Sequence, residues 1–165
     1  MTTMTCEDAR EAIAARRFTG WRGLPNGCRP EALFGAPLDD AWGSLPLGSA
    51  LEPARSRLLD LPGYYRPLAY VRDGVAVAFD AMNPQLDSTW QALAETLGTP
   101  DATFDWVFGT VAMPGGERVY AGRGITVFLN PETQAVVYVT VYAPTTVEAY
   151  ARRIRPPREK RPHGR

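Results

Sequence analysis

Residues 122–144, GRGITVFLNPETQAVVYVTVYAP, carry the clearest structural pattern of the chain. From residue 137 to 142, valine alternates with tyrosine and threonine, which is the period of a β-strand with two chemically different faces. The apolar run 125–129 precedes it, and Asn-Pro-Glu-Thr at residues 130–133 is typical of a turn. The stretch therefore predicts two antiparallel strands.

Residues 63–84, GYYRPLAYVRDGVAVAFDAMNP, resemble that stretch. Two apolar runs, 65–71 and 75–82, flank Asp73-Gly74, a pair that suits a type I′ hairpin because both central residues of such a turn need positive φ. Both stretches end on a proline, and LFGAP at 33–37 matches TLGTP at 96–100 in type. These correspondences predict an internal duplication.

Helix signals come before each strand-rich region. Thr5 and Asp8 form a capping-box pattern for a helix over residues 7–17, and Pro30 suits the first turn of a short second helix. Asp87-Ser88 with Gln91 predicts the start of a helix that ends at Gly98. The remaining expected elements are strands over 42–47, 104–112 and 118–121, a turn at 114–116, and a last helix from Thr145 or Thr146 to Arg153.

These elements predict an α+β protein built from a duplicated unit of a short helix plus an antiparallel β-meander. The two sheet units share one compact body. The expected divisions are an N-terminal helix (1–19), a first repeat (20–85), a second repeat (86–151) and a basic, proline- and arginine-rich C-terminal tail (152–165).

Composition is that of a globular protein, with 45% hydrophobic and 22% charged residues among 165. The net charge is zero, but residues 152–165 hold six arginines and one lysine against Glu159, so the rest of the chain is acidic by six charges. An acidic body argues against a nucleic-acid-binding fold, whose contact surface needs clustered Lys and Arg. The tail alone could bind phosphates or an acidic partner.

No apolar stretch is long enough to span a membrane, and residues 1–17 lack the apolar core of a secretory signal, so we expect a cytoplasmic protein. An exported chain whose signal has been removed is the alternative. In a cytoplasm Cys6 and Cys28 are expected as free thiols. No metal site or cofactor is expected, because His163 in the tail is the single histidine.

The repeated phrase, a short helix ending in Leu/Phe-Gly-x-Pro and then a meander, resembles the tandem unit of the beta-lactamase inhibitor protein family. It is also similar to the small lipoproteins of the outer-membrane assembly machine. The matching residues are Gly27, Glu31, Leu33, Phe34, Gly35 and Pro37, and again Ala94, Leu97, Gly98 and Pro100. The resemblance implies a scaffold that binds other proteins through a concave, aromatic-rich sheet face. Those proteins are exported, and the inhibitor has a disulfide in each repeat, whereas both cysteines here lie in the first half.

Common catalytic motifs are absent. None of the four serines lies in a Gly-x-Ser-x-Gly elbow, and the body has no histidine for a Ser-His or Cys-His relay. Gly122-Arg123-Gly124 precedes a predicted strand, whereas a nucleotide-binding loop precedes a helix.

Carboxylates are the remaining candidates for acid–base chemistry. They are Asp39, Asp40, Asp60, Asp80 and Glu117. Asp80 stands out because it interrupts the apolar run 75–82, where burial would raise its pKa. The favoured alternative places Asp80 on the solvent side or pairs it with Arg66 or Arg72.

Aromatic residues give the best binding signal. Tyr138 and Tyr142 share a strand face with Thr140, and of the adjacent pair Tyr64 and Tyr65 at least one is expected to be exposed. The alternative is that a helix covers this face. The proposed partner-binding residues are Tyr64, Tyr65, Tyr138, Tyr142 and Trp42, together with Arg155, Arg158, Lys160 and Arg161 of an extended, solvated tail.

The sequence thus favours a non-catalytic protein-binding module, an immunity or inhibitor-type protein or an accessory subunit, whose partner is another protein. The alternative is a small-molecule binder or weak acid–base enzyme with a pocket near Asp80. Nucleic-acid binding through the tail is a third, weaker hypothesis.

Overall fold

The computed structural model describes residues 5–15, 28–29, 32–33, 43–44, 55–58, 65–72, 75–82 and 89–155. The strands are β1 (Gly43–Ser44), β2 (Arg55–Leu58), β3 (Tyr65–Arg72), β4 (Val75–Met82), β5 (Ala102–Phe108), β6 (Val111–Tyr120), β7 (Ile125–Asn130) and β8 (Ala135–Tyr142). The helices are α1 (Cys6–Ala14), α3 (Trp90–Leu97) and α4 (Val147–Ala149), which continues as the π-helical turn η2 (Tyr150–Ile154).

The eight strands form one antiparallel sheet in the order β1-β2-β3-β4-β8-β7-β6-β5, so the fold is α+β. Each half of the chain supplies a four-stranded meander, and the meanders join where β4 pairs with β8, with Asp80 opposite Thr140. The sheet is therefore continuous, and the two separate sheet units expected from the sequence merge into it.

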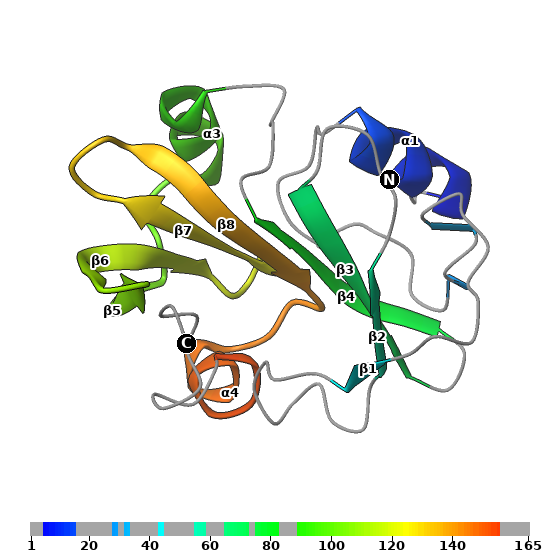
Figure 1. Cartoon of the computed structure of the whole chain (residues 1–165). Helices are drawn as coiled ribbons and strands as arrows, with labels where there is room; N and C mark the ends of the chain where they lie inside the picture. Colours follow the sequence, from blue (N-terminus) through cyan, green and yellow to red (C-terminus); the bar gives the residue numbers. More distant parts are fainter. Residues whose placement is uncertain are drawn as a thin grey trace.

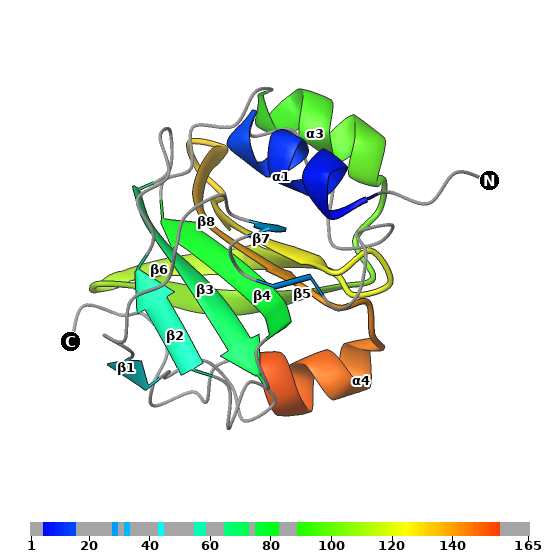
Figure 2. The same ribbon diagram turned by 90° about the vertical axis from the view of Figure 1, so that its right-hand side faces the viewer.

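Helices lie on both faces of this sheet. Figures 1 and 2 show α1 and α3 on one side and α4 on the other. Val139 and Val141 of β8 point into the core beneath α1 and α3, while Tyr142 contacts Tyr150 on the α4 side. The alternation predicted for residues 137–142 thus separates two hydrophobic layers.

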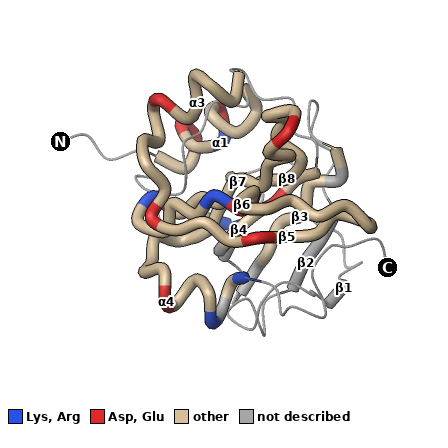
Figure 3. Tube along the Cα trace, turned by 90° about the vertical axis from the view of Figure 1, so that its left-hand side faces the viewer, with Lys and Arg blue, Asp and Glu red and all other residues tan. Residues whose placement is uncertain are grey.

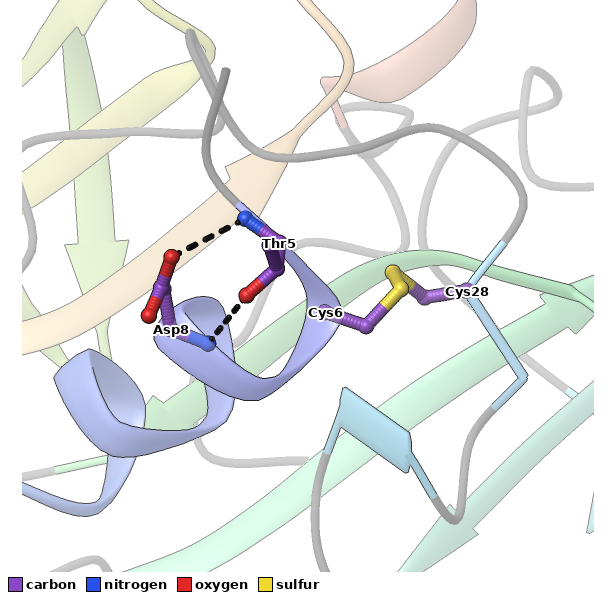
Figure 4. The surroundings of a disulfide bond; sticks show 4 residues. All are labelled: Thr5, Cys6, Asp8 and Cys28. Atoms are coloured by element: carbon purple, nitrogen blue, oxygen red, sulfur yellow. Dashed lines mark hydrogen bonds between the residues drawn. A yellow bond between two sulfur atoms is a disulfide. The ribbon is translucent and has the colours of Figure 1, made fainter. Parts of the chain in front are cut away.

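The two longer helices begin at side-chain caps. Thr5 accepts a hydrogen bond from the Asp8 amide and Asp8 accepts one from the Thr5 amide, which confirms the capping box (Figure 4). The N-cap of α3 is Thr89, whose hydroxyl accepts a hydrogen bond from the Ala92 amide, and not the predicted Asp87-Ser88. It ends at Gly98 as expected, where φ is 78°.

The β5–β6 hairpin differs from its prediction. Its turn lies at Gly109, with φ of 66°, and residues 114–116 fall inside β6. Between the pairs Phe104–Glu117 and Trp106–Met113, β5 advances by two residues and β6 by four, so the Pro-Gly-Gly segment forms a bulge and not a turn. A Cβ on Gly116 would lie 2.4 Å from the Leu129 carbonyl oxygen and 2.5 Å from Trp106 Nε1.

Cys6 and Cys28 form a disulfide, so the expectation of two free thiols is wrong (Figure 4). Their Cα atoms are 6.0 Å apart, within the ordinary range for a bridge. The Cys28 carbonyl also accepts a hydrogen bond from the Ala76 amide of β4, so the bridge links α1 to the sheet. Sequence spacing could not show this approach, because it depends on how α1 packs.

The C-terminal helix agrees with its prediction, beginning after the Thr146 cap and continuing through η2 to Ile154. β2 was not predicted, since Arg-Ser-Arg-Leu lacks an apolar pattern. The Asp73-Gly74 turn lies outside the described residues.

Acidic positions occur on α1, α3 and α4, and acidic and basic positions are interspersed along the traced chain (Figure 3). No helix among the described residues is long and apolar enough to cross a membrane.

Candidate functional site

The sheet face that carries α4 contains two buried carboxylates. Asp80 of β4 is 1% exposed and Glu117 of β6 is fully buried. Burying a carboxylate is costly unless hydrogen bonds or an opposite charge compensate it. Asp80 and Glu117 have different compensating partners.

Glu117 is held by the C-terminal helix. The hydroxyl of Tyr150 donates to its Oε2 at 2.7 Å, and Arg155 Nε lies 3.0 Å from both carboxylate oxygens. The same guanidinium donates to the Asp105 carbonyl at 3.1 Å and stacks 4.3 Å above the centre of the Phe104 ring. These five residues, which we call the Glu117 cluster, fasten the end of η2 to β5 and β6.

Burial raises the pKa of Glu117, and the Tyr150 hydrogen bond and the charge of Arg155 act against that rise. Burial likewise raises the pKa of Tyr150, and the nearby Glu117 charge adds to the effect. The tyrosine therefore stays protonated and donates. The cluster is a compensated structural ion pair.

Asp80 is paired with hydroxyl groups. Tyr70 of β3 donates a hydrogen bond to its Oδ2, and Tyr138 of β8 also hydrogen-bonds this carboxyl group. Oδ1 has no hydrogen-bond partner within the described part of the chain. Burial raises the pKa of Asp80 to about 7, with the two tyrosine hydrogen bonds acting in the opposite direction. A solvent-facing Asp80, one form of the favoured alternative from sequence, is therefore wrong. The other form, a pairing with Arg66 or Arg72, involves side chains outside the described part of the chain.

An open cleft of about 600 Å³ lies beside the Glu117 cluster. Its walls are residues 103–107 of β5, residues 112–114 of β6 and Arg155. β5 is an edge strand of the sheet, so the cleft lies at the rim of the sheet. Its volume is within the range of small-molecule sites in proteins.

Apolar side chains are exposed at this rim. Val107 is 37% and Val111 is 53% exposed, and both belong to the β5–β6 hairpin. Behind them Trp106 is buried, and its Nε1 donates to the Leu129 carbonyl at 3.1 Å. The indole is thereby fixed, so the hairpin presents apolar surface on a rigid support.

Of the aromatic residues proposed from sequence, the three that the structure describes do not form one open surface. Tyr142 is 1% exposed and lies against Tyr150, with its hydroxyl 2.8 Å from Thr126 Oγ1. Tyr138 is half-buried beside Asp80, whereas Tyr65 is 54% exposed. The alternative that a helix covers this face describes Tyr142 correctly.

Arg155 is not part of a solvated arm. Its side chain is 13% exposed because it packs into the Glu117 cluster. The other proposed site residues lie outside the described part of the chain. They are Tyr64, Trp42, Arg158, Lys160 and Arg161.

The cleft residues Val107, Ala112 and Met113 were missed by sequence reasoning. Trp-Val-Phe at 106–108 and Val-Ala-Met at 111–113 are apolar on both strand faces, and a hairpin exposes part of such a pair. The turn was predicted at residues 114–116 and not at Gly109, so residues 104–112 were predicted as one strand and their pairing in a hairpin was not recognised.

Within the described ranges, no group of three or more His, Cys, Asp or Glu side chains is placed to hold a metal ion. No protein-family model, curated protein or solved structure matches the chain. Function must therefore be inferred from the cleft and the two carboxylates.

Proposed function

We propose that this chain is a non-catalytic protein-binding module, of the immunity or inhibitor type or an accessory subunit of a larger assembly. The observation that carries the proposal is the open cleft at the β5 edge, which the exposed Val107 helps to line, with exposed Val111 on the same hairpin. Apolar side chains on a rigid rim, next to an arginine, are typical of protein interfaces. This moves the proposed contact surface from the tyrosine face to the β5–β6 hairpin.

A tandem repeat remains part of the proposal. The order of the strands, one meander followed by the other in reverse, supports a duplicated helix-plus-meander unit. A likeness to the inhibitor and assembly-lipoprotein scaffolds would agree with such a duplication. The disulfide supports action in an oxidising compartment instead of the expected cytoplasm.

The test uses two matched exposed alanines. Ala112 lines the cleft, and Ala135 lies at the start of β8 and does not line it. Affinity capture from the source lysate should yield the same stoichiometric partner with wild type and Ala135→Asp, and lose it with Ala112→Asp. A partner retained by Ala112→Asp would rule out the cleft, and absence of a partner from every sample would remove the binding-module proposal.

A second function is favoured by Asp80, whose Oδ1 lacks a hydrogen-bond partner within the described residues. A buried carboxyl with a pKa near neutrality could serve a small-molecule site or acid–base step. In that case a metabolite raises the melting temperature of wild type, and Asp80→Asn abolishes the rise.

A further inference from the structure

β5 is the last strand of the sheet, and among the described strands only β6 pairs with it (Figure 1). It extends over seven residues, whereas β1 at the opposite edge has two. The backbone groups of an edge strand that point away from its neighbour have no strand partner. An extended segment of another chain can pair with such an edge, which is a recurring mode of peptide recognition.

The cleft follows this edge. Five consecutive residues of β5, 103–107, line it. Successive side chains of a strand point to opposite faces of the sheet, and burial follows that alternation, with exposed residues at 103, 105 and 107 and less exposed residues at 104 and 106. A cleft that is lined from both faces of one strand runs along the edge of that strand, where an added strand would lie.

The lining of the cleft offers contacts to both the backbone and the side chains of an extended segment. In the described part of the chain, Arg155 uses Nε for Glu117 and Nη2 for the Asp105 carbonyl, and its Nη1 has no partner there. Nη1 can therefore donate to a backbone carbonyl. Phe104 and Met113, which also line the cleft, can pack against apolar side chains.

Asp105 determines which kind of strand fits. It is the central residue of β5, it is exposed, and it lines the cleft. A second copy of the chain that paired antiparallel about this centre would place two Asp105 carboxylates opposite each other, which is destabilising. A lysine or arginine at that position would instead form a favourable cross-strand pair. The charge of Arg155 does not supply this pair, because it is compensated by Glu117.

We infer that an extended segment of the partner protein pairs with β5 as an added strand, with a basic side chain opposite Asp105 and apolar side chains on the face of Phe104 and Trp106. This inference rests on the proposed function and specifies how the partner binds. The Asp105 carbonyl already accepts a hydrogen bond from Arg155, so the added segment forms its main-chain hydrogen bonds with other residues of β5.

Fluorescein-labelled peptides test the inference by fluorescence anisotropy. The probe is Thr-Val-Thr-Val-Lys-Val-Thr-Val-Thr, whose valines share one strand face and whose lysine lies on the other. In a second peptide Glu replaces Lys. We expect the lysine peptide to bind at least about threefold more tightly, because a cross-strand attraction replaces a repulsion.

Two N-methylated forms of the lysine peptide test the main-chain hydrogen bonds. One is methylated at the amides of the valines, the other at the amides of the remaining residues. Successive amides of a strand point to opposite edges, so each form blocks one edge of the peptide and leaves the other intact. We expect their affinities to differ by at least about tenfold, since an added strand loses several hydrogen bonds in one form only.

Two protein variants test the position of the lysine. Asp105→Asn removes the charge and keeps the oxygen that accepts a hydrogen bond from the Gly115 amide, and it should abolish the preference for Lys over Glu. Asp101→Asn is the matched control and should keep the preference. Asp101 accepts a hydrogen bond from the Gly122 amide in the same way, but it does not line the cleft.

Four outcomes would overturn the inference. Equal affinities of the two methylated peptides would refute an added strand. A preference for Lys that persists in Asp105→Asn would refute the basic residue opposite Asp105. No binding of the lysine peptide at millimolar concentration would refute the stated occupant, and a dimer of the protein that this peptide dissociates would make the occupant a second copy. The capture experiment with Ala112→Asp tests the cleft without these peptides, so either proposal can fail alone.

Discussion

The hydroxyl of Tyr150 donates a hydrogen bond to Oε2 of Glu117, and this contact joins residues 33 positions apart in the sequence. Both side chains are buried, so the C-terminal helix is attached to the sheet by a polar contact inside an apolar layer. Several measurable properties depend on this attachment and on the features around it.

Tyr150→Phe should lower the free energy of unfolding by about 2 kcal/mol, because it removes a donor from a buried carboxylate. Tyr142→Phe is the matched control: it deletes a buried hydroxyl whose partner is the neutral Thr126, and should cost about 1 kcal/mol. Urea denaturation at neutral pH measures both. Equal losses would mean that Glu117 carries no charge in the folded protein.

Arg155→Met should destabilise the protein by about 3 kcal/mol at neutral pH, because Glu117 would be left as a buried charge without its cation. Glu117→Gln in the same chain should recover part of this loss. At acidic pH, where Glu117 protonates in both states, the cost of Arg155→Met should shrink. A cost that does not change with pH, and no recovery in the double variant, would contradict the ion pair.

Asp80→Asn should change how stability depends on pH. The folded pKa of about 7 exceeds the usual 3.8, so between these values the unfolded chain releases a proton that the folded chain retains. Wild type therefore loses up to about 4 kcal/mol as pH rises from about 4 to 7, relative to Asp80→Asn, and the difference stays constant above that range. Denaturation of both proteins across this range measures it, and a difference that is independent of pH would show that Asp80 does not titrate there.

Reduction of the Cys6–Cys28 bridge should lower stability by about 3 kcal/mol, the value expected for a crosslink that closes a loop of 22 residues. Thermal unfolding with and without dithiothreitol measures the effect. The Cys6→Ser/Cys28→Ser variant serves as control and should not respond to the reductant. Alkylation of both cysteines in the unreduced, denatured chain would contradict the bridge.

Gly116→Ala should cost at least about 2 kcal/mol, because the added methyl would overlap the Leu129 carbonyl and the Trp106 indole, which are hydrogen-bonded to each other. Gly122→Ala is the matched control, since its added Cβ would lie no closer than 4.0 Å to Asp101 Oδ2. The near-ultraviolet circular dichroism of tryptophan, together with urea denaturation, distinguishes the two. Similar stabilities would mean that the bulge can shift to accept a side chain.

Much of the fold was predictable because its signals are local. The Thr5 and Asp8 cap, the stop at Gly98 and the alternation of β8 each depend on neighbouring residues. The hairpin turn was misplaced because Pro114-Gly115-Gly116 has stronger turn composition than Gly109-Thr110. Gly115 instead uses its φ of 63° within a strand bulge.

The candidate site was predictable only in part. Asp80 was recognised from a polar residue in an apolar run, but its burial required the pairing of β4 with β8. Arg155 was identified as a contact residue for its charge, although its contact is with Glu117 of the same chain. Contacts between distant segments decide both cases, and local patterns do not encode them.

The pairing of β4 with β8 has a consequence for folding. Asp80 and Thr140 are neighbours there although 60 residues separate them, whereas the disulfide and the Glu117–Tyr150 contact each lie within one half of the chain. Each half can therefore form its own stabilising contact before the two halves pair, and the pairing of β4 with β8 becomes the late, slow step of folding. β4 of one molecule could pair with β8 of another in the same way, so a domain-swapped dimer is the misassembly to look for when the protein refolds at high concentration.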